Sequence, residues 1–567
     1  MRDLSVDQTK QPNATDAAPA TLSEEHKTVQ ETSRQIAGRL QICVVLACIV
    51  VLFVHNVERW NPTVFFGRLH DDGIYFSTAK ALADGQGYVL ASFPGTPAQT
   101  KYPIVYPWLL SWIWKLHPAF PANLIDAVRL TEFFGCWALL ATFFLLRKLP
   151  GIGHNVALVL TAVCAFQPFL VRFSGVIMSD VPFAALVLTA LALADRAARP
   201  KAEAWLVIAT GLAAGLSTGM RTIGVAVIGG IFVLALRRRA YRQAILLGIA
   251  AALVVGVESW PTMLHRVPVK PVPLESPDSG WVYVLAYYTD YIGFNWRMGV
   301  PTFTALLEMV KLNLLLLLSS PGSTIAGLTS KWASTLTAIL SVPIWLGIAR
   351  QRKHEEWQPI FFVLFLYSCV VLVWPWPQPE RFSLPFIPVF LSGLWLELRW
   401  LNGALRAKLC PSVPLSQRLL AGTLTVAFAS LLAWAAWDYL VRDPRDLQLA
   451  SASQARALEQ RTQVYAWIRH HTAAGDRIAA YSDAPMFLYT GRQGLRPIAF
   501  LPTSGYLSDT KSQEHDLAHI ADAARHIGAR YWLRTADDFD LEVGKEKIDA
   551  RLAELDSVFP VLFQSQD

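Results

Sequence analysis

Two adjacent acidic residues directly follow the first strongly apolar segment of the chain. Asp71 and Asp72 open the stretch DDGIYFSTAKALADG, just after Arg68. Carboxylates this close to a bilayer are costly unless they are paired or used in chemistry. If the stretch is helical, Tyr75 lies one turn after Asp71 and on the same face. The spacing therefore favours a short helix that presents an acid and a tyrosine to one site.

The two acids have competing structural interpretations. Either one can serve as the N-cap of the helix that follows. Capping accounts for one carboxylate but not for two, so we predict that Asp71 acts as a general base. Asp72 stays open between binding an acceptor, binding a hard cation such as Mg²⁺ or Mn²⁺, and capping the helix. Tyr75 and Tyr106 are further candidates for lining the same cavity.

Four charged residues could contribute to that cavity. Lys101 precedes an aromatic and proline-rich run, and Arg381 lies in PQPERFSLPFIP. Cations at a membrane interface can bind a phosphate, and arginine can hold it with two hydrogen bonds. The alternative for both is an ordinary interfacial cation whose stem covers apolar surface. Asp180 in SGVIMSDVPF and Arg221 in STGMRTIG either face the cavity or belong to a helix cap and an outside turn.

The composition predicts that a polytopic α-helical membrane protein positions these residues. Of 567 residues, 53% are hydrophobic and 16% are charged, and apolar runs recur from Leu40 to Tyr439. Such runs are typical of transmembrane helices. About eleven spans give a consistent topology, near residues 40–57, 124–146, 155–172, 177–195, 203–218, 222–236, 243–261, 332–349, 359–374, 383–399 and 419–440.

The charges of the connecting loops predict the orientation. Loops assigned to the inside carry clusters such as Arg237, Arg238 and Arg239, whereas the short outside turns carry one cation each. Because basic loops favour the cytoplasm, we expect a cytoplasmic N-terminus and an extracytoplasmic Asp71. The same rule leads us to interpret 303–325 as an interfacial or re-entrant outside helix. Since the basic residues sit in these loops, the net charge of +7 does not indicate a nucleic-acid partner.

Composition also divides the chain into three domains. Residues 1–38 are polar and predicted to be a disordered cytoplasmic tail, and residues 39–440 are the membrane domain. In 441–567 helical and strand patterns alternate, which predicts a small extracytoplasmic α/β domain with strands at IAAYS, RYWLRT and PVLFQ. None of the six cysteines falls in the long outside segments, so we expect neither a disulfide nor a cysteine metal site.

The loop after the first span resembles the first extracytoplasmic loop of the GT-C glycosyltransferases. The resemblance is to the family 39-like enzymes, which include protein O-mannosyltransferases and lipid A aminoarabinose transferases. It is carried by the acid pair and tyrosine in Asp71–Tyr75, by the small helix that ends near Gly87, and by the Lys-Tyr-Pro-Ile-Val-Tyr-Pro run from Lys101. The second acid, Asp72, is Asp where many relatives have Glu.

This resemblance implies a function as well as a GT-C fold. It implies a polyprenyl-phosphate-linked monosaccharide as donor, a lipid, glycan or protein as acceptor, and inversion at the anomeric carbon on the outer face of a bacterial-type inner membrane. Asp71 would be the base, and Lys101 and Arg381 would bind the donor phosphate. Relatives differ in their need for a divalent cation. A transporter or flippase, and a non-catalytic protein that binds a lipid-linked sugar, remain as alternatives.

Overall fold

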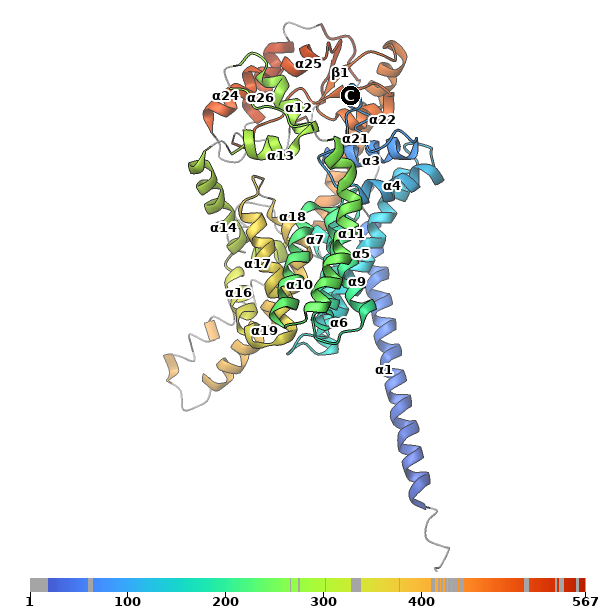
Figure 1. Ribbon diagram of the computed structural model, residues 1–567, viewed down its shortest axis with the longest axis vertical. Coiled ribbons are helices and arrows are strands. Elements are labelled where there is room, and N and C mark those ends of the chain that lie inside the picture. The colour runs from blue at the N-terminus through green and yellow to red at the C-terminus, as the bar shows by residue number, and fades with distance from the viewer. Residues whose placement is uncertain are drawn as a thin grey trace, which may run out of the picture.

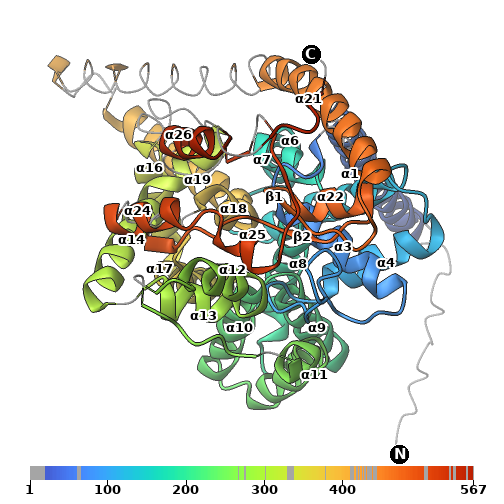
Figure 2. The same ribbon diagram turned by 90° about the horizontal axis from the view of Figure 1, so that it is seen from above.

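The computed structural model has two tiers, a bundle of long helices and a cap on one end of it (Figure 1). It describes residues 19–59, 65–265, 267–273, 276–300, 302–327, 338–376, 378–408, 443–503, 509–535, 538–539, 545–556 and 560–565, with scattered positions between 414 and 437. Viewed from above, the cap elements lie over the bundle (Figure 2).

Long apolar helices build the bundle. Six described helices are long and apolar enough to cross a membrane, or seven if the bent pair α6–α7 forms one span. This confirms a polytopic helical membrane protein, whereas the count of about eleven spans stays a prediction, since 419–440 falls largely outside the described residues. The bundle helices are α1 (Pro19–Glu58), α5 (Leu124–Leu146), α6 (His154–Ala165), α7 (Pro168–Ser174), α8 (Asp180–Ala197), α9 (Ala204–Met220), α10 (Val225–Arg237), α11 (Tyr241–His265), α14 (Phe303–Ala326), α16 (Ser341–Arg350), α17 (Gln358–Leu372), α18 (Pro379–Ser383) and α19 (Ile387–Lys408).

Small residues set how closely the bundle helices approach. A Cβ atom at Gly211 of α9 would lie 2.8 Å from the Ala250 side chain of α11, and one at Gly215 would lie 2.9 Å from that of Val254. Close helix contact through small residues is the usual packing mode in membranes. The close packing of α9 against α11 fixes the end of α9, where Arg221 follows the last helical residue.

One expectation about the bundle needs correction, and one stays a prediction. The expected disordered tail is helical from Pro19, because α1 runs unbroken from Pro19 to Glu58; residues 1–18 lie outside the described residues. The polar composition of this segment led to the prediction of disorder, but Glu, Gln, Lys and Ala are also good helix formers. The helix expected at 303–325 is present as α14, a 24-residue helix that is long and apolar enough for a membrane span, and its interfacial or re-entrant position stays a prediction.

The lower end of α14 meets the start of α16. Ser341 Oγ donates to Ser319 O at 2.7 Å and accepts from Gly322 N at 2.8 Å, and Trp345 Nε1 donates to Leu318 O at 3.0 Å. In Figure 1, α16 continues below α14 toward the end of the bundle away from the cap. Residues 332–337 of the span predicted at 332–349 lie outside the described residues.

The cap contains a three-stranded parallel sheet. Its order is β2–β1–β3, with Ile478 opposite Gly494 and Tyr531. The predicted α/β character is confirmed, and the strands expected at IAAYS and RYWLRT are β1 (Ile478–Ala480) and β3 (Tyr531–Leu533). The strand expected at PVLFQ is wrong, because residues 560–564 are irregular, and β2 (Gly494–Leu495) was not predicted. The other C-terminal elements are α21 (Asp443–His471), α22 (Asp483–Thr490), α24 (Thr510–Ala518), α25 (Asp522–His526) and α26 (Lys545–Asp556).

The C-terminal segment packs on two earlier loops. The first loop supplies α3 (Asp71–Ala83) and α4 (Val105–Leu116), and the second supplies α12 (Ser279–Thr289), α13 (Tyr291–Gly293) and the π-helical turn η2 (Phe294–Met298). Gly494 N donates to Ser92 O at 2.9 Å, and Gln493 Nε2 donates to Ala91 O at 3.1 Å. One buried apolar cluster contains Ile74, Tyr283 and Leu495 and so joins all three pieces.

Candidate active site

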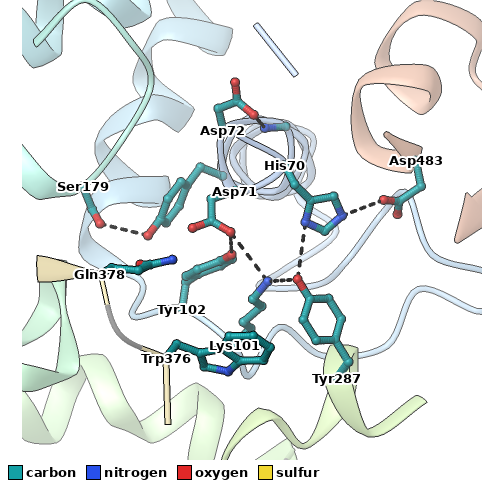
Figure 3. Close-up of polar contacts among 12 residues, drawn as sticks. His70, Asp71, Asp72, Lys101, Tyr102, Ser179, Tyr287, Trp376, Gln378 and Asp483 are labelled. Atoms are coloured by element: carbon teal, nitrogen blue, oxygen red, sulfur yellow. Dashed lines mark hydrogen bonds and ion pairs between the residues drawn. The ribbon is translucent and has the colours of Figure 1, made fainter. Parts of the chain in front are cut away.

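Asp71 lies at the junction of the cap and the bundle, at the start of α3 (Figure 3). Its Oδ1 accepts a short hydrogen bond from Tyr102 Oη and lies 3.6 Å from Lys101 Nζ. Its Oδ2 lies 3.3 Å from a terminal guanidinium nitrogen of Arg381. The predicted helix is confirmed, and it brings Asp71 together with both predicted phosphate-binding cations.

Lys101 is held inside a tyrosine cage. Its side chain is 4% exposed, and Nζ donates to Tyr287 Oη at 2.5 Å. The ammonium also lies over the rings of Tyr287, Tyr102 and Tyr291, at 4.1, 5.0 and 5.2 Å from their centroids. Ring faces attract a cation and partly replace its lost hydration. Burial lowers the pKa of Lys101, and the nearby Asp71 carboxylate opposes that shift.

A second group of charges adjoins the first. Arg381 grips Asp180 with two hydrogen bonds, Nε to Oδ1 and a terminal nitrogen to Oδ2, both 3.0 Å long. Arg221 also donates to Asp180 Oδ1. The structure thus brings Asp180 and Arg221 together with Arg381, which also contacts Asp71. Three cations, Lys101, Arg381 and Arg221, face two carboxylates, which leaves one net positive charge available for an anionic ligand.

The charges around Asp71 keep it ionised despite its burial. Burial raises the pKa of Asp71, but Lys101 and Arg381 outweigh it, so the pKa lies below its usual value. The hydrogen bond from Tyr102 acts in the same direction. A carboxylate held ionised can accept a proton, and Tyr102 fixes where its oxygen points.

The two predicted tyrosines lie in consecutive layers under Asp71. Tyr75 shares a 2.9 Å hydrogen bond with Ser179 Oγ, and its ring is tilted against that of Tyr102, with the centroids 4.4 Å apart. Tyr106 lies behind Tyr75, edge-on at 5.2 Å, and hydrogen-bonds to Thr131 Oγ1 at 2.8 Å. Tyr75 therefore borders the site, whereas the fully buried Tyr106 supports it from the core.

Asp72 points away from Asp71 (Figure 3). Its two oxygens accept from the backbone N–H groups of Gly67 at 2.7 Å and Gly73 at 2.8 Å, so it organises the turn into α3. Burial raises the pKa of Asp72 to about 7. Within the described residues, no three or more His, Cys, Asp or Glu side chains gather to hold a metal ion. A divalent cation at Asp72 therefore stays a prediction, whereas the role of Asp72 in the turn into α3 is evident from its hydrogen bonds.

Four neighbours of the site were not among the predicted site residues. Tyr102 directly follows Lys101 in the sequence, and this position next to a predicted site residue could have suggested that it belongs to the site. His70, Tyr287 and Asp483 form the far side, with His70 Nε2 3.1 Å from Asp483 Oδ1 and Nδ1 3.5 Å from Tyr287 Oη. No local pattern marks Tyr287 or Asp483, because they approach Lys101 only through tertiary packing.

An apolar pocket opens beside Arg381 on the bundle side. It lies between α14, α16, α17 and the α18–α19 segment, and Gln378 and Phe382 flank its upper end. Gln378 Oε1 accepts from Arg381 at 3.0 Å, which links the pocket to the charged site. Leucine, valine and phenylalanine side chains line it, among them Leu316, Leu364, Val371 and Phe386.

The comparisons with known proteins agree on the fold. No protein-family model and no curated protein matches the chain by sequence. ArnT from Cupriavidus metallidurans bound to undecaprenyl phosphate matches with a TM-score of 0.51 and 13% identity, over 83% of this chain and 88% of that one. The oligosaccharyltransferase AglB from Archaeoglobus fulgidus, in complex with an inhibitory peptide and a dolichol-phosphate, matches with 0.50 and 15%, over 87% and 69%. Both have the GT-C fold, which confirms that part of the prediction.

Proposed function

We propose that this chain is a membrane glycosyltransferase that moves a monosaccharide from a polyprenyl-phosphate donor to a lipid, glycan or protein acceptor. The observation that carries the proposal is the position of the Asp71 carboxylate, 3.6 Å from Lys101 and 3.3 Å from Arg381. A base and phosphate-binding cations are the two components that such a transfer requires, and here they touch. The solved structures of similar fold contain undecaprenyl phosphate and a dolichol-phosphate.

The proposed reaction is a single displacement. The acceptor hydroxyl oxygen attacks the anomeric carbon of the sugar while Asp71 takes its proton. The new carbon–oxygen bond forms as the bond from the anomeric carbon to the phosphate oxygen breaks, and that electron pair leaves with the polyprenyl phosphate. The configuration at the anomeric carbon inverts. Lys101 and Arg381 stabilise the negative charge that develops on the leaving phosphate, so no general acid is needed.

We place the lipid part of such a donor at the apolar pocket beside Arg381, whose volume of about 30 Å³ means that the lining helices must separate to admit a prenyl chain. The pocket lies in the bundle and reaches Gln378, which is hydrogen-bonded to Arg381. A prenyl chain in this pocket would bring its phosphate to the cations at the upper end. This arrangement, with the loop-charge asymmetry, favours a cap on the outer face of a bacterial-type inner membrane and a cytoplasmic N-terminus.

The alternative of a transporter receives less support from the same residues. Transporters usually bind their substrate near the midplane of the bilayer, between broken helices. Asp71 instead begins α3, which lies at the cap end of the bundle in Figure 1, and Lys101 and Arg381 contact Asp71 there. Because both oxygens of Asp72 accept backbone hydrogen bonds, we assign the proton transfer to Asp71.

A donor panel tests the proposal. The purified full chain in detergent is mixed with polyprenyl-phosphate-linked hexoses and pentoses and with acceptor fractions, and the release of free polyprenyl phosphate is measured. We expect release with one donor class, and it should depend on the acceptor. Binding of the lipids without release under every condition would support a non-catalytic binding protein. Movement of intact donor across vesicles containing the protein would support a flippase.

A further inference from the structure

A line of hydrogen-bonding groups connects the C-terminal segment to Lys101 (Figure 3). Asp483, the first residue of α22, lies 3.1 Å from His70 Nε2. His70 Nδ1 lies 3.5 Å from Tyr287 Oη, the longest contact of the line, and Tyr287 Oη lies 2.5 Å from Lys101 Nζ. His70 and Lys101 come from the first loop, Tyr287 comes from α12 and Asp483 comes from α22, so three distant parts of the chain meet here.

The donors and acceptors along the line are consistent in one direction. The ammonium of Lys101 can only donate, so Tyr287 Oη accepts from it. Tyr287 can then give its own proton to His70 Nδ1, which requires a neutral His70 with its proton on Nε2. Asp483 Oδ1 accepts that proton and so selects this tautomer. Burial raises the pKa of Asp483 to about 7, so its carboxyl is shared between the ionised and the neutral form near neutral pH, and an oxygen of either form can accept this hydrogen bond. Burial, assisted by Arg496 and Lys101, lowers the pKa of His70 and keeps the ring neutral.

Burial makes each link costly to lose. Asp483 is fully buried, His70 is 6% exposed, and the Lys101 side chain is 4% exposed. Removing one partner from a buried hydrogen bond leaves the other unsatisfied. His70 also has a φ of +60°, a backbone conformation that few non-glycine residues adopt. The turn into α3 therefore carries a strained residue whose side chain is fixed by the C-terminal segment.

We propose that Asp483 is a positioning residue of the transferase site, which acts through His70 and Tyr287 to hold Lys101 in place for the donor phosphate. The proposal rests on the proposed function and extends it. It gives the C-terminal segment a role in donor binding, which the sequence did not predict. A simpler structural role is that Asp483 only stabilises the positive end of α22, as acids in a first helical turn do. That role would leave Lys101 unaffected.

Binding of undecaprenyl phosphate separates the two roles. The probe is this lipid alone, titrated into the full chain in detergent, with Asp483→Asn, Tyr287→Phe and the double variant compared with wild type. If the residues act as one unit, each single variant weakens binding roughly 10-fold, as expected for a lost hydrogen bond to a charged group. The double variant should then also lose roughly 10-fold rather than roughly 100-fold, since coupled residues are not additive.

Ser279→Ala is the matched control. Ser279 shares a 2.8 Å hydrogen bond with His515 and so joins the same helix α12 to the C-terminal segment, away from Lys101. It should leave lipid binding unchanged, and a loss equal to that of Asp483→Asn would show general undocking and overturn the proposal. If Asp483→Asn does not fold, Tyr287→Phe decides, because it keeps the ring over Lys101 and removes only the hydroxyl.

The remaining outcomes distinguish this proposal from the proposed function. Wild-type protein that binds the lipid, with unchanged affinity in both single variants, overturns the positioning role and leaves the transferase proposal standing. If the double variant loses affinity for the lipid by the product of the two single losses, the positioning role is overturned as well. Wild-type protein that does not bind undecaprenyl phosphate or its sugar-linked form overturns both.

Discussion

Asp71 shows how a buried carboxylate can remain a base. Its burial favours the neutral form, but Lys101 and Arg381 lie close enough to reverse that preference. The same cations face the position where a phosphate would leave. Asp180 holds Arg381 by two hydrogen bonds and keeps it from pairing fully with Asp71. A charge balance among a few residues thus determines both proton transfer and phosphate binding.

Removing Lys101 should change the pH dependence of the reaction. Lys101 makes the largest contribution that lowers the pKa of Asp71, so Lys101→Ala should raise that pKa. Because the base acts when ionised, the acid limb of kcat/KM, which reports the free enzyme, should move to higher pH. The donor KM should also rise, by roughly 10-fold or more. Rates measured across the acidic range test this.

Lys115→Ala controls for loss of a lysine as such. Lys115 lies in the last turn of α4 and over the ring of Trp112, with no contact to Asp71. Its acid limb should coincide with that of the wild type. An unchanged limb in Lys101→Ala, or a shift to lower pH, would contradict the role of Lys101 in keeping Asp71 ionised.

At the scale of elements, the contact between α3 and α22 joins the cap to the site. A Cβ atom at Gly73 would lie 2.5 Å from Pro485 Cδ and 3.2 Å from Pro485 N, so α22 would have to move. Gly73→Ala should therefore destabilise the protein by about 1–3 kcal/mol, as overpacking does. It should also weaken lipid binding, because Asp483 lies two residues before Pro485. Thermal unfolding in detergent measures the first effect.

Gly403→Ala is the control for this substitution. Gly403 lies in α19, is exposed, and has open space where a Cβ would stand. Alanine there should be neutral or slightly stabilising, because it reduces the freedom of the unfolded chain. Equal unfolding temperatures for Gly73→Ala and wild type would mean that α22 is not pressed against α3.

The elements also show which features the sequence could predict. The helix α3 was predicted within the right stretch because its acid pair, periodicity and terminal glycine are local signals. The sequence could not predict whether α14 crosses the membrane. The loop-charge rule fixes the number of crossings, but it does not tell which of two neighbouring apolar stretches forms a crossing. The answer depends on contacts such as those of Ser341 with the end of α14.

At the scale of the whole molecule, the site combines predictable and unpredictable parts. Asp71, Lys101, Asp180, Arg221 and Arg381 converge as predicted, since each marks the end of a span or a loop motif. The far side of the site, by contrast, comes from α12 and from the C-terminal segment. Its members carry no local signal, because their meeting point is created by the docking of three distant segments.

The most direct test of the account is the rate of sugar transfer by Asp71→Asn with a verified donor. The substitution preserves the size of the side chain and removes the basic carboxylate. The account predicts a loss of roughly 10²–10⁴-fold in turnover. Affinity for polyprenyl phosphate should be retained, since Lys101 and Arg381 lose a competing anion. Turnover near that of the wild type, in protein of matched expression and folding, would contradict the assignment of Asp71 as the base.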